Sequence, residues 1–375
     1  CKVYMMNNLL WSPSNDSIKK TSINRFILKI NREYSLNLQD YNDLYIWSIE
    51  NIENFWTEVW RFSKIVYSSN YSKVLSNSHM LDAEWFKNSK LNYAENLLKR
   101  RDSNTAIYFF GENEVSSEIS FNDLYLSVSK VAFSLRKMGL EKGDRVAAVM
   151  PNMPETIIAM LATTSIGAIW SSCSPDFGKK AILDRFNQIE PKVIFYSDGY
   201  YYKGKPYCLN EKINDVINSL SSVENSYKVN YILNESSDWK DLNNNNNKVV
   251  DFEQLDFNHP LFIMYSSGTT GKPKSIVHSV GGTLLQHLKE HMLHVGLKEN
   301  DVFFYFTTCG WMMWNWLVSS LAIGVSIVLY DGHPFYPEKD SLLKKMNSIG
   351  VDVFGTSAKY ISNLNLFKIK ASKFN

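Results

Sequence analysis

A segment of nine residues, 266–274, has the glycines and side chains that phosphate binding requires. Gly268 and Gly271 allow backbone N–H groups to approach an anion closely, because glycine carries no Cβ. The remaining donors are hydroxyl and ammonium groups: Ser266, Ser267, Thr269, Thr270, Lys272 and Lys274. Apolar runs at 261–265 and 275–279 predict a strand on each side. The pattern therefore predicts a phosphate-binding loop between two strands.

This segment differs from the loop of the P-loop nucleotide hydrolases. When Gly271 and Lys272 are aligned with the glycine and lysine of GxxxxGK(S/T), Ser266 falls on the first glycine and Pro273 on the metal-binding hydroxyl. Two of the four defining positions therefore fail. A surface hairpin without function is the alternative, but the density of phosphate-binding groups favours the loop.

The composition favours a globular protein whose partners are small molecules. With 375 residues, of which 45% are hydrophobic, the chain can bury a large core. Its 40 basic and 38 acidic residues give a net charge of +2, without the broad basic field that nucleic-acid binding needs. The four cysteines are far apart and form no CxxC pair, so neither a zinc site nor a disulfide framework is indicated. We therefore expect a cytoplasmic protein with no nucleic-acid partner.

A run without charged residues, 302–330, is long enough to cross a membrane. Small and polar residues interrupt it, and it divides into a strand at 302–306, a helical middle part and a strand at 325–330. Strands that are covered on both faces of a parallel sheet have this apolar profile. We therefore predict a buried strand, helix and strand and no membrane span.

Strands and helices alternate in the sequence from residue 106 onward. Ser120 is a plausible helix N-cap, and the apolar stripe that follows ends at Gly139. Strands are predicted at 145–150 and 168–171, with a helix between them that begins at Pro154. This rhythm predicts an α/β fold with mainly parallel sheets flanked by helices.

We expect three regions along the chain. Residues 1–100, rich in tryptophan and tyrosine, form an N-terminal cap region, 101–242 a first α/β subdomain, and 243–375 an incomplete second subdomain that carries the loop. The division falls at the asparagine run 243–247, which is typical of a solvated loop.

Residues 265–274, Tyr-Ser-Ser-Gly-Thr-Thr-Gly-Lys-Pro-Lys, resemble the signature phosphate loop of the adenylate-forming superfamily, which includes the acyl-CoA synthetases. The resemblance implies the large N-terminal domain of that superfamily. It also implies that the loop holds the β- and γ-phosphates of ATP, with Mg²⁺, while a carboxylate attacks the α-phosphorus. CoA then displaces AMP from the acyl-adenylate. Such catalysis works by positioning and charge neutralisation.

A narrower resemblance is to the acetoacetyl-CoA synthetases. It is carried by segments 278–291, 306–316, 330–335 and 354–360, and also by 11–14, 91–97 and 174–177. It implies that acetoacetate, ATP and CoA give acetoacetyl-CoA, AMP and pyrophosphate. Acetyl-CoA synthetases have an aspartate where this chain has Thr308, which argues against acetate.

The resemblance also suggests binding residues. Thr308 and Trp311 are candidates for the acyl pocket, and Lys203 and Lys205 are candidates for contacts with CoA. Trp311 is equally compatible with an ordinary core, and for the tryptophans and methionines of 312–316 the core is the favoured interpretation. No catalytic residue is assigned.

Three histidines, His287, His291 and His294, have spacings that place them on one face of a helix. Zinc binding is one interpretation of that spacing. We favour a partly exposed helix face and predict no metal site, because the family needs no protein-bound zinc.

The ends of the sequence raise two expectations. Cys1 is followed by no apolar signal segment, so either upstream residues are missing or a leader has been removed. After Tyr360 the chain ends before the family's adenine, ribose and C-terminal lysine segments, so we expect an N-terminal fragment that is inactive alone. A nucleotide-binding module without catalysis, or a ligase for another short-chain acid, is the alternative.

Overall fold

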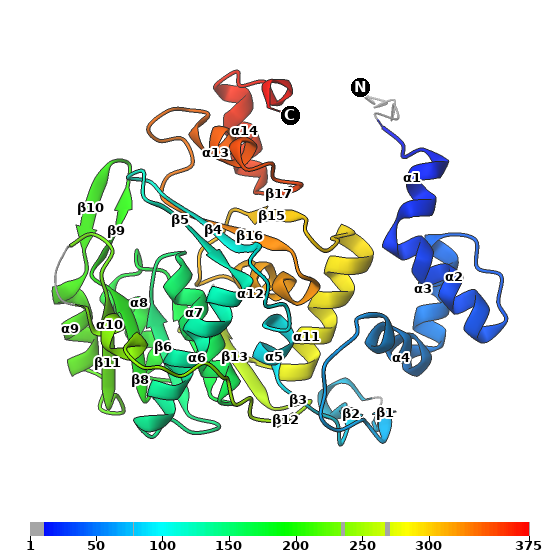
Figure 1. The fold of residues 1–375 in the computed structure, drawn as a ribbon, viewed down its shortest axis with the longest axis horizontal. Coiled ribbons are helices and arrows are strands. Elements are labelled where there is room, and N and C mark those ends of the chain that lie inside the picture. Colours follow the sequence, from blue (N-terminus) through cyan, green and yellow to red (C-terminus); the bar gives the residue numbers. More distant parts are fainter. Residues whose placement is uncertain (1–10, 78, 234–236, 267–270, 375) are drawn as a thin grey trace. The chain divides into compact units, whose positions relative to one another are not determined.

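The computed structural model describes residues 11–77, 79–233, 237–266 and 271–374 (Figure 1). Contacts within the chain group it into two compact units. The smaller unit extends to Lys64 and includes Lys289–Leu297, and the larger unit comprises Ile65–Leu288 and the chain from Lys298 onward.

The smaller unit is helical. Its helices are α1 (Asn15–Lys20), α2 (Ser22–Tyr34), α3 (Tyr41–Glu50), α4 (Ile52–Phe62) and the π-helical turn η2 (Glu290–Val295). Phe26 of α2 is fully buried and packs edge-on against Phe55 and Phe62 of α4. Glu58 is also buried, and its carboxylate is paired with Lys29 and Arg61. A buried carboxylate needs such partners, because desolvation penalises an unpaired charge.

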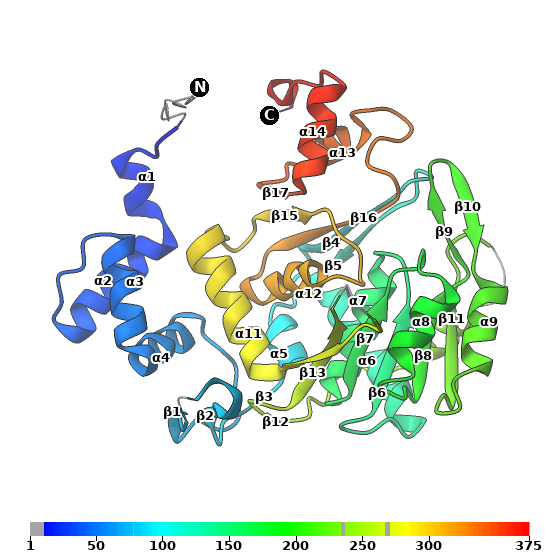
Figure 2. The same ribbon diagram turned by 180° about the vertical axis from the view of Figure 1, so that it is seen from behind.

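The larger unit contains two large sheets (Figures 1 and 2). The six-stranded sheet has the order β11-β8-β6-β7-β13-β14, and only β14 in it runs antiparallel. Its strands are β6 (Arg145–Val149), β7 (Ile169–Cys173), β8 (Val193–Ser197), β11 (Asn225–Val229), β13 (Pro260–Tyr265) and β14 (Ser275–Ser279).

The five-stranded sheet has the order β17-β15-β16-β4-β5, with β5 as its antiparallel edge strand. Its strands are β4 (Thr105–Gly111), β5 (Ser116–Ser120), β15 (Val302–Tyr305), β16 (Ser326–Asp331) and β17 (Val353–Gly355). The predicted α/β class with mainly parallel sheets is therefore confirmed.

Helices connect and cover the strands of both sheets. They are α5 (Tyr93–Leu97), α6 (Phe121–Lys137), α7 (Pro154–Ser165), α8 (Lys179–Phe186), α9 (Asn210–Asn218), α10 (Asp238–Asn243), α11 (Val280–Lys289), α12 (Met312–Ser319), α13 (Ser341–Ser348) and α14 (Ala358–Leu366). Nearly every residue of α7 is buried, because it packs against α5, α6 and β7. The smaller elements are β1 (Lys73–Leu75), β2 (Trp85–Lys87), β3 (Lys90–Leu91), β12 (Leu255–Asp256), η1 (Met80–Asp82), η3 (Ser320–Ile323) and η4 (Ala371–Lys373).

A separate two-stranded hairpin follows β8. It consists of β9 (Gly199–Tyr202) and β10 (Lys205–Cys208), which pair with each other in antiparallel register. In both views the tip of this hairpin lies beside the turn between β4 and β5 (Figures 1 and 2).

Local sequence signals explain several of these elements. The Ser120 hydroxyl accepts a hydrogen bond from the Asp123 N–H and caps α6, as predicted. The uncharged run 302–330 forms β15, α12 and β16. Across the part of the chain that the structure describes, no helix is both long and apolar enough to cross a membrane.

The asparagine run 243–247 lies in the connection from β11 to β13. Asn245 donates to the carbonyl of Lys130, and Asn247 donates to the carbonyl of Ser129, so both side chains fasten the run to α6. Each large sheet takes strands from both sides of this run.

Candidate functional site

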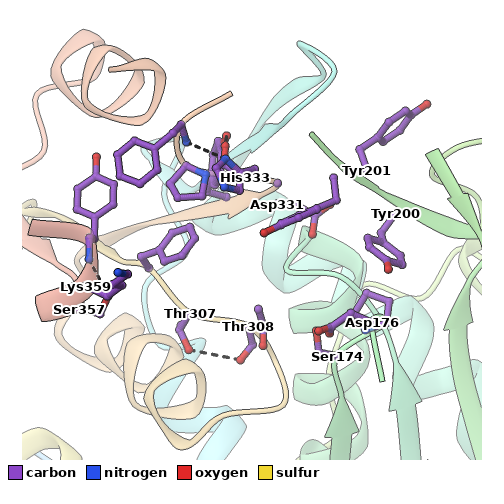
Figure 3. Close-up of a pocket in the computed structure, with 18 of the residues that line it drawn as sticks. Ser174, Asp176, Tyr200, Tyr201, Thr307, Thr308, Asp331, His333, Ser357 and Lys359 are labelled. Carbon is purple, nitrogen blue, oxygen red and sulfur yellow. Dashed lines mark hydrogen bonds between the residues drawn. The ribbon is translucent and has the colours of Figure 1, made fainter. Parts of the chain in front are cut away.

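A cavity of about 620 Å³ opens where the carboxyl ends of strands from both large sheets meet (Figure 3). Ligands of α/β proteins commonly bind at this edge. The segments after β7, β15 and β16, the β9–β10 hairpin and α14 supply the lining: Ser174, Pro175, Asp176, Tyr200, Tyr201, Tyr202, Tyr207, Phe306, Thr307, Thr308, Tyr330, Asp331, Gly332, His333, Pro334, Phe335, Ser357, Lys359, Tyr360 and Asn363.

Aromatic rings dominate two sides of the cavity. Tyr200 and Tyr207 of the hairpin stack with centroids 5.1 Å apart, and Phe335 stacks on Tyr360 of α14 at 4.9 Å. Figure 3 shows Tyr200 and Lys359 on opposite sides of the cavity. Flat aromatic faces of this kind suit a planar heterocycle, because stacking is favourable for any π-surface.

Asp331, at the end of β16, is a titratable group in the lining. Burial raises the pKa of its carboxyl from the ordinary 3.8 to about 7. The folded protein therefore holds a proton at Asp331 that the unfolded chain has already lost above pH 4. This carboxyl stabilises the fold fully only below pH 4, and that contribution is lost as the pH rises to about 7.

Replacing Asp331 by asparagine should remove this pH-dependent loss. We expect the Tm of Asp331→Asn minus the Tm of the parent to be larger at pH 8 than at pH 5. Only the parent has a buried carboxyl at this position, which at pH 8 must either ionise without water or keep its proton. Thermal unfolding of both proteins at the two pH values measures the difference. The exposed Glu211→Gln is the control and should shift the Tm equally at both pH values. A Tm difference for Asp331→Asn that does not change with pH would contradict the prediction.

The predicted phosphate loop connects β13 and β14, which pair in antiparallel register up to Tyr265 and Ser275. Ser267, Gly268, Thr269 and Thr270 lie outside the described residues. At the base of the loop the Ser266 N–H donates to the Lys274 carbonyl at 3.0 Å, and the Lys274 N–H donates to the Ser266 hydroxyl at 3.1 Å. Gly271, Lys272 and Lys274 are exposed, so both ammonium groups are accessible to a ligand.

Two residues that the sequence analysis did not single out support this loop. Gln188 donates to the Pro273 carbonyl at 2.8 Å and accepts from the Ser275 hydroxyl at 2.9 Å. The Arg185 carbonyl accepts from the Tyr265 hydroxyl at 3.2 Å, which ties the end of β13 to α8. Neither residue has a motif in the sequence, because both act through contacts between distant segments.

The two acyl-pocket candidates lie in different surroundings. Thr308 lines the cavity, and its Oγ1 is buried without a hydrogen-bond partner among the described residues. Trp311 is 57% exposed at the N-terminus of α12 and lies outside the cavity lining. Trp314 is fully buried, where its indole N–H donates to the Asn152 side chain at 2.9 Å. Thr308 is therefore the acyl-pocket candidate that belongs to the cavity lining.

The two CoA candidates lie on the β9–β10 hairpin. Lys203 is at its turn, with Nζ 5.7 Å from the centroid of the Tyr202 ring, and Lys205 begins β10. Both lysines are exposed and neither belongs to the cavity lining, whereas the tyrosines of the same hairpin do. The lysines thus flank the cavity from the hairpin.

The expectation that the three histidines form a partly exposed helix face was wrong. His287 and His291 are buried and only His294 is exposed, so these residues do not form a partly exposed face. The helix α11 continues into the π-helical η2, which alters the spacing of side chains around the axis. His287 Nδ1 lies 2.7 Å from the Ser319 hydroxyl within the core. Within the described ranges there is no cluster of three metal-binding side chains.

Comparison with known proteins defines the class. Residues 95–371 match the family model of the AMP-binding enzymes, and residues 41–97 match that of the acetyl-coenzyme A synthetase N-terminus. The chain therefore belongs to the AMP-binding enzyme family.

Within this family the chain is similar to acetoacetyl-CoA synthetases. That of Danio rerio is 46% identical over 381 residues, covering 96% of this chain and 56% of the relative. That of Rhizobium meliloti is 45% identical over 363 residues, covering 94% and 55%. The structure of the acetoacetyl-CoA synthetase from Streptomyces lividans matches with a TM-score of 0.94 and 36% identity, covering 98% of this chain and 58% of that one. The chain spans about half the length of the curated relatives it matches.

Proposed function

We propose that this chain is part of a ligase that activates acetoacetate with ATP and transfers the acetoacetyl group to CoA, releasing AMP and pyrophosphate. The observation that carries the proposal is the similarity to acetoacetyl-CoA synthetases along almost the whole chain. The cavity and the phosphate loop are consistent with it, because β7 and β13 are parallel neighbours and the segments that follow both strands leave the same edge of one sheet.

In this proposal the loop acts on the leaving group of the first step. The acetoacetate carboxylate attacks the α-phosphorus of ATP, which forms the acyl-adenylate and releases pyrophosphate. Lys272 and Lys274 neutralise the charge on the β- and γ-phosphates, and Mg²⁺ accompanies the triphosphate as part of the substrate. The hydrogen bonds between Ser266 and Lys274 close the base of the loop, which brings its two ends together.

In this proposal the acyl group lies against Thr308. Thr308 supplies a buried hydroxyl with no partner among the described residues, and such a group gains most from a ligand that can accept its hydrogen bond. The keto oxygen of acetoacetate is such an acceptor, whereas acetate has no equivalent atom. Trp311 remains a candidate for the outer wall of this pocket.

The substrate can be tested directly with the protein at its full natural length. Rates of acyl-CoA formation with acetoacetate, acetate and propionate at equal concentration should rank acetoacetate first. Acetate as the fastest substrate would reject the acetoacetate assignment and leave a ligase for another short-chain acid. Binding of ATP without turnover of any of these acids would instead support a nucleotide-binding module.

The CoA site is proposed to use the hairpin lysines. Replacing Lys203 and Lys205 together by glutamine should raise the KM for CoA about tenfold, because two charges that face its phosphates are lost. The KM of the parent should also rise more steeply with salt than that of the variant, since charge attraction is screened. Steady-state kinetics at two ionic strengths measure both effects.

Lys298→Gln is a matched control for this pair. Lys298 is exposed and precedes β15, at the amino end of the sheet and thus opposite the cavity edge. Its replacement should leave the KM for CoA unchanged. Equal KM values in the parent and the Lys203→Gln, Lys205→Gln variant would remove both lysines from the CoA site.

A further inference from the structure

Glu112 connects two segments that form walls of the cavity. It follows the last residue of β4 and is only 4% exposed. One carboxylate oxygen accepts a hydrogen bond from the Gly204 N–H at the hairpin turn, and the other accepts one from the His333 N–H at 2.5 Å. One carboxylate therefore binds the backbones of two segments that are far apart in the sequence.

Both segments held by Glu112 line the cavity, whereas Glu112 itself does not. The hairpin contributes four tyrosines, and the segment after β16 contributes Gly332, His333, Pro334 and Phe335. The rings of Tyr202 and His333, one from each segment, meet edge-on with centroids 5.2 Å apart. The carboxylate and this ring contact thus join the two walls.

Two glycines allow close packing beside the hydrogen bonds of Glu112. Gly332 has φ +139°, and a Cβ at this position would lie 2.5 Å from Glu112 Cβ. Gly204 has φ +74°, and a Cβ there would meet the Tyr336 ring. Both glycines allow the backbone to approach closely enough for its N–H groups to reach the carboxylate.

The hairpin depends on such a contact for its orientation. Among the described strands, β9 and β10 pair only with each other and belong to neither large sheet. Main-chain pairing with a sheet therefore does not fix the tip of the hairpin, which carries Lys203. Glu112 supplies the hydrogen bond at this tip, through Gly204.

We propose that Glu112 is a positioning residue that fixes the β9–β10 hairpin against the segment after β16 and so holds the hairpin lysines in place for the thiol substrate. The inference rests on the proposed function, in which the hairpin lysines contact CoA. A carboxylate is needed because it accepts two hydrogen bonds with two oxygens, whereas glutamine has one acceptor and would turn an N–H₂ group toward the second backbone donor.

Glu112→Gln in the full-length enzyme separates positioning from general stability. We expect the acetoacetate-dependent exchange between pyrophosphate and ATP, which needs no CoA, to stay within about twofold of the parent. The KM for CoA should rise about tenfold, which corresponds to the loss of one hydrogen bond to a charged group. Glu112→Ala, which removes both acceptors, should raise it further.

Glu114→Gln is the matched control, because Glu114 is exposed in the turn that follows Glu112. It should leave both reactions unchanged. A folded Glu112→Gln enzyme with the parent KM for CoA would overturn the proposal, and so would equal losses in the exchange reaction and in thioester formation. If Glu112→Ala does not fold, Glu112→Gln alone decides.

A measurement without substrates distinguishes this proposal from the function on which it rests. Amide hydrogen exchange across 199–208 should be faster in Glu112→Gln than in the parent, because the tip of the hairpin loses its anchor. Unchanged exchange there would overturn the anchoring role whatever the enzyme catalyses. A different pair of results would refute the proposed function and the role in binding the thiol. In that case amide exchange is faster in the variant, but the parent enzyme does not use CoA.

Discussion

Replacing Lys272 and Lys274 together by glutamine should lower acetoacetate-dependent exchange between pyrophosphate and ATP by at least about 100-fold in the full-length enzyme. Both ammonium groups are exposed on a loop whose base is closed by hydrogen bonds between Ser266 and Lys274. Their charge stabilises the transition state in which pyrophosphate leaves more than it stabilises bound ATP. The loss of activity should therefore appear mainly in kcat rather than in the KM for ATP. Exchange of labelled pyrophosphate at saturating ATP measures it.

Two further variants show whether charge at these positions is responsible. Lys180→Gln removes a neighbouring exposed lysine that pairs with Asp184 at 2.6 Å, and it should change the rate less than about twofold. Replacing Lys272 and Lys274 by arginine keeps both charges and should restore part of the rate. A folded double glutamine variant that keeps more than a third of the parent rate would mean that these lysines do not hold the phosphates.

Thr308→Val should reduce the preference of the enzyme for acetoacetate over butyrate by about tenfold or more. Valine has nearly the shape of threonine but lacks the hydroxyl, and butyrate lacks the keto oxygen that this hydroxyl is proposed to bind. The Oγ1 atom is buried without a partner among the described residues, so a hydrogen bond to the substrate would satisfy it. The ratio of kcat/KM for the two acids in each protein gives the result.

The comparison of two acids is the control for damage to the fold. A general loss of activity would lower kcat/KM for both acids equally and leave the ratio unchanged, and that outcome would contradict a specific role for Thr308. Trp311→Ala tests the other candidate in the same assay. Trp311 is 57% exposed and lies outside the cavity lining. An unchanged KM for acetoacetate in Trp311→Ala would remove this residue from the acyl pocket.

Local elements were predictable from the sequence because their causes are local. Ser120 followed by an apolar stripe specifies the start and the buried face of α6. The uncharged run 302–330 specifies β15, α12 and β16, since strands covered on both faces lack the alternation of an exposed sheet. The strands on either side of 266–274 were found in the same way.

Long-range contacts were not predictable in this way. The burial of His287 and His291 depends on neighbours from other segments and on the π-helical turn that follows α11, and spacing along one helix reports neither. The raised pKa of Asp331 depends on how far its neighbours in the folded chain exclude water from the carboxyl. Glu112 has no motif around it, and only its two backbone partners give it a role.

By itself, the sequence determined the class of fold, the two strands on either side of the predicted phosphate loop and the resemblance to an enzyme family, because each depends on residues that are close together along the chain. The tertiary structure alone decided where the ligand cavity lies and which residues line it. Its walls come from five segments, and parallel strands bring their carboxyl ends to one edge whatever their separation in sequence. Burial there then sets the chemistry of each side chain, since desolvation and hydrogen-bond partners exist only in the folded chain.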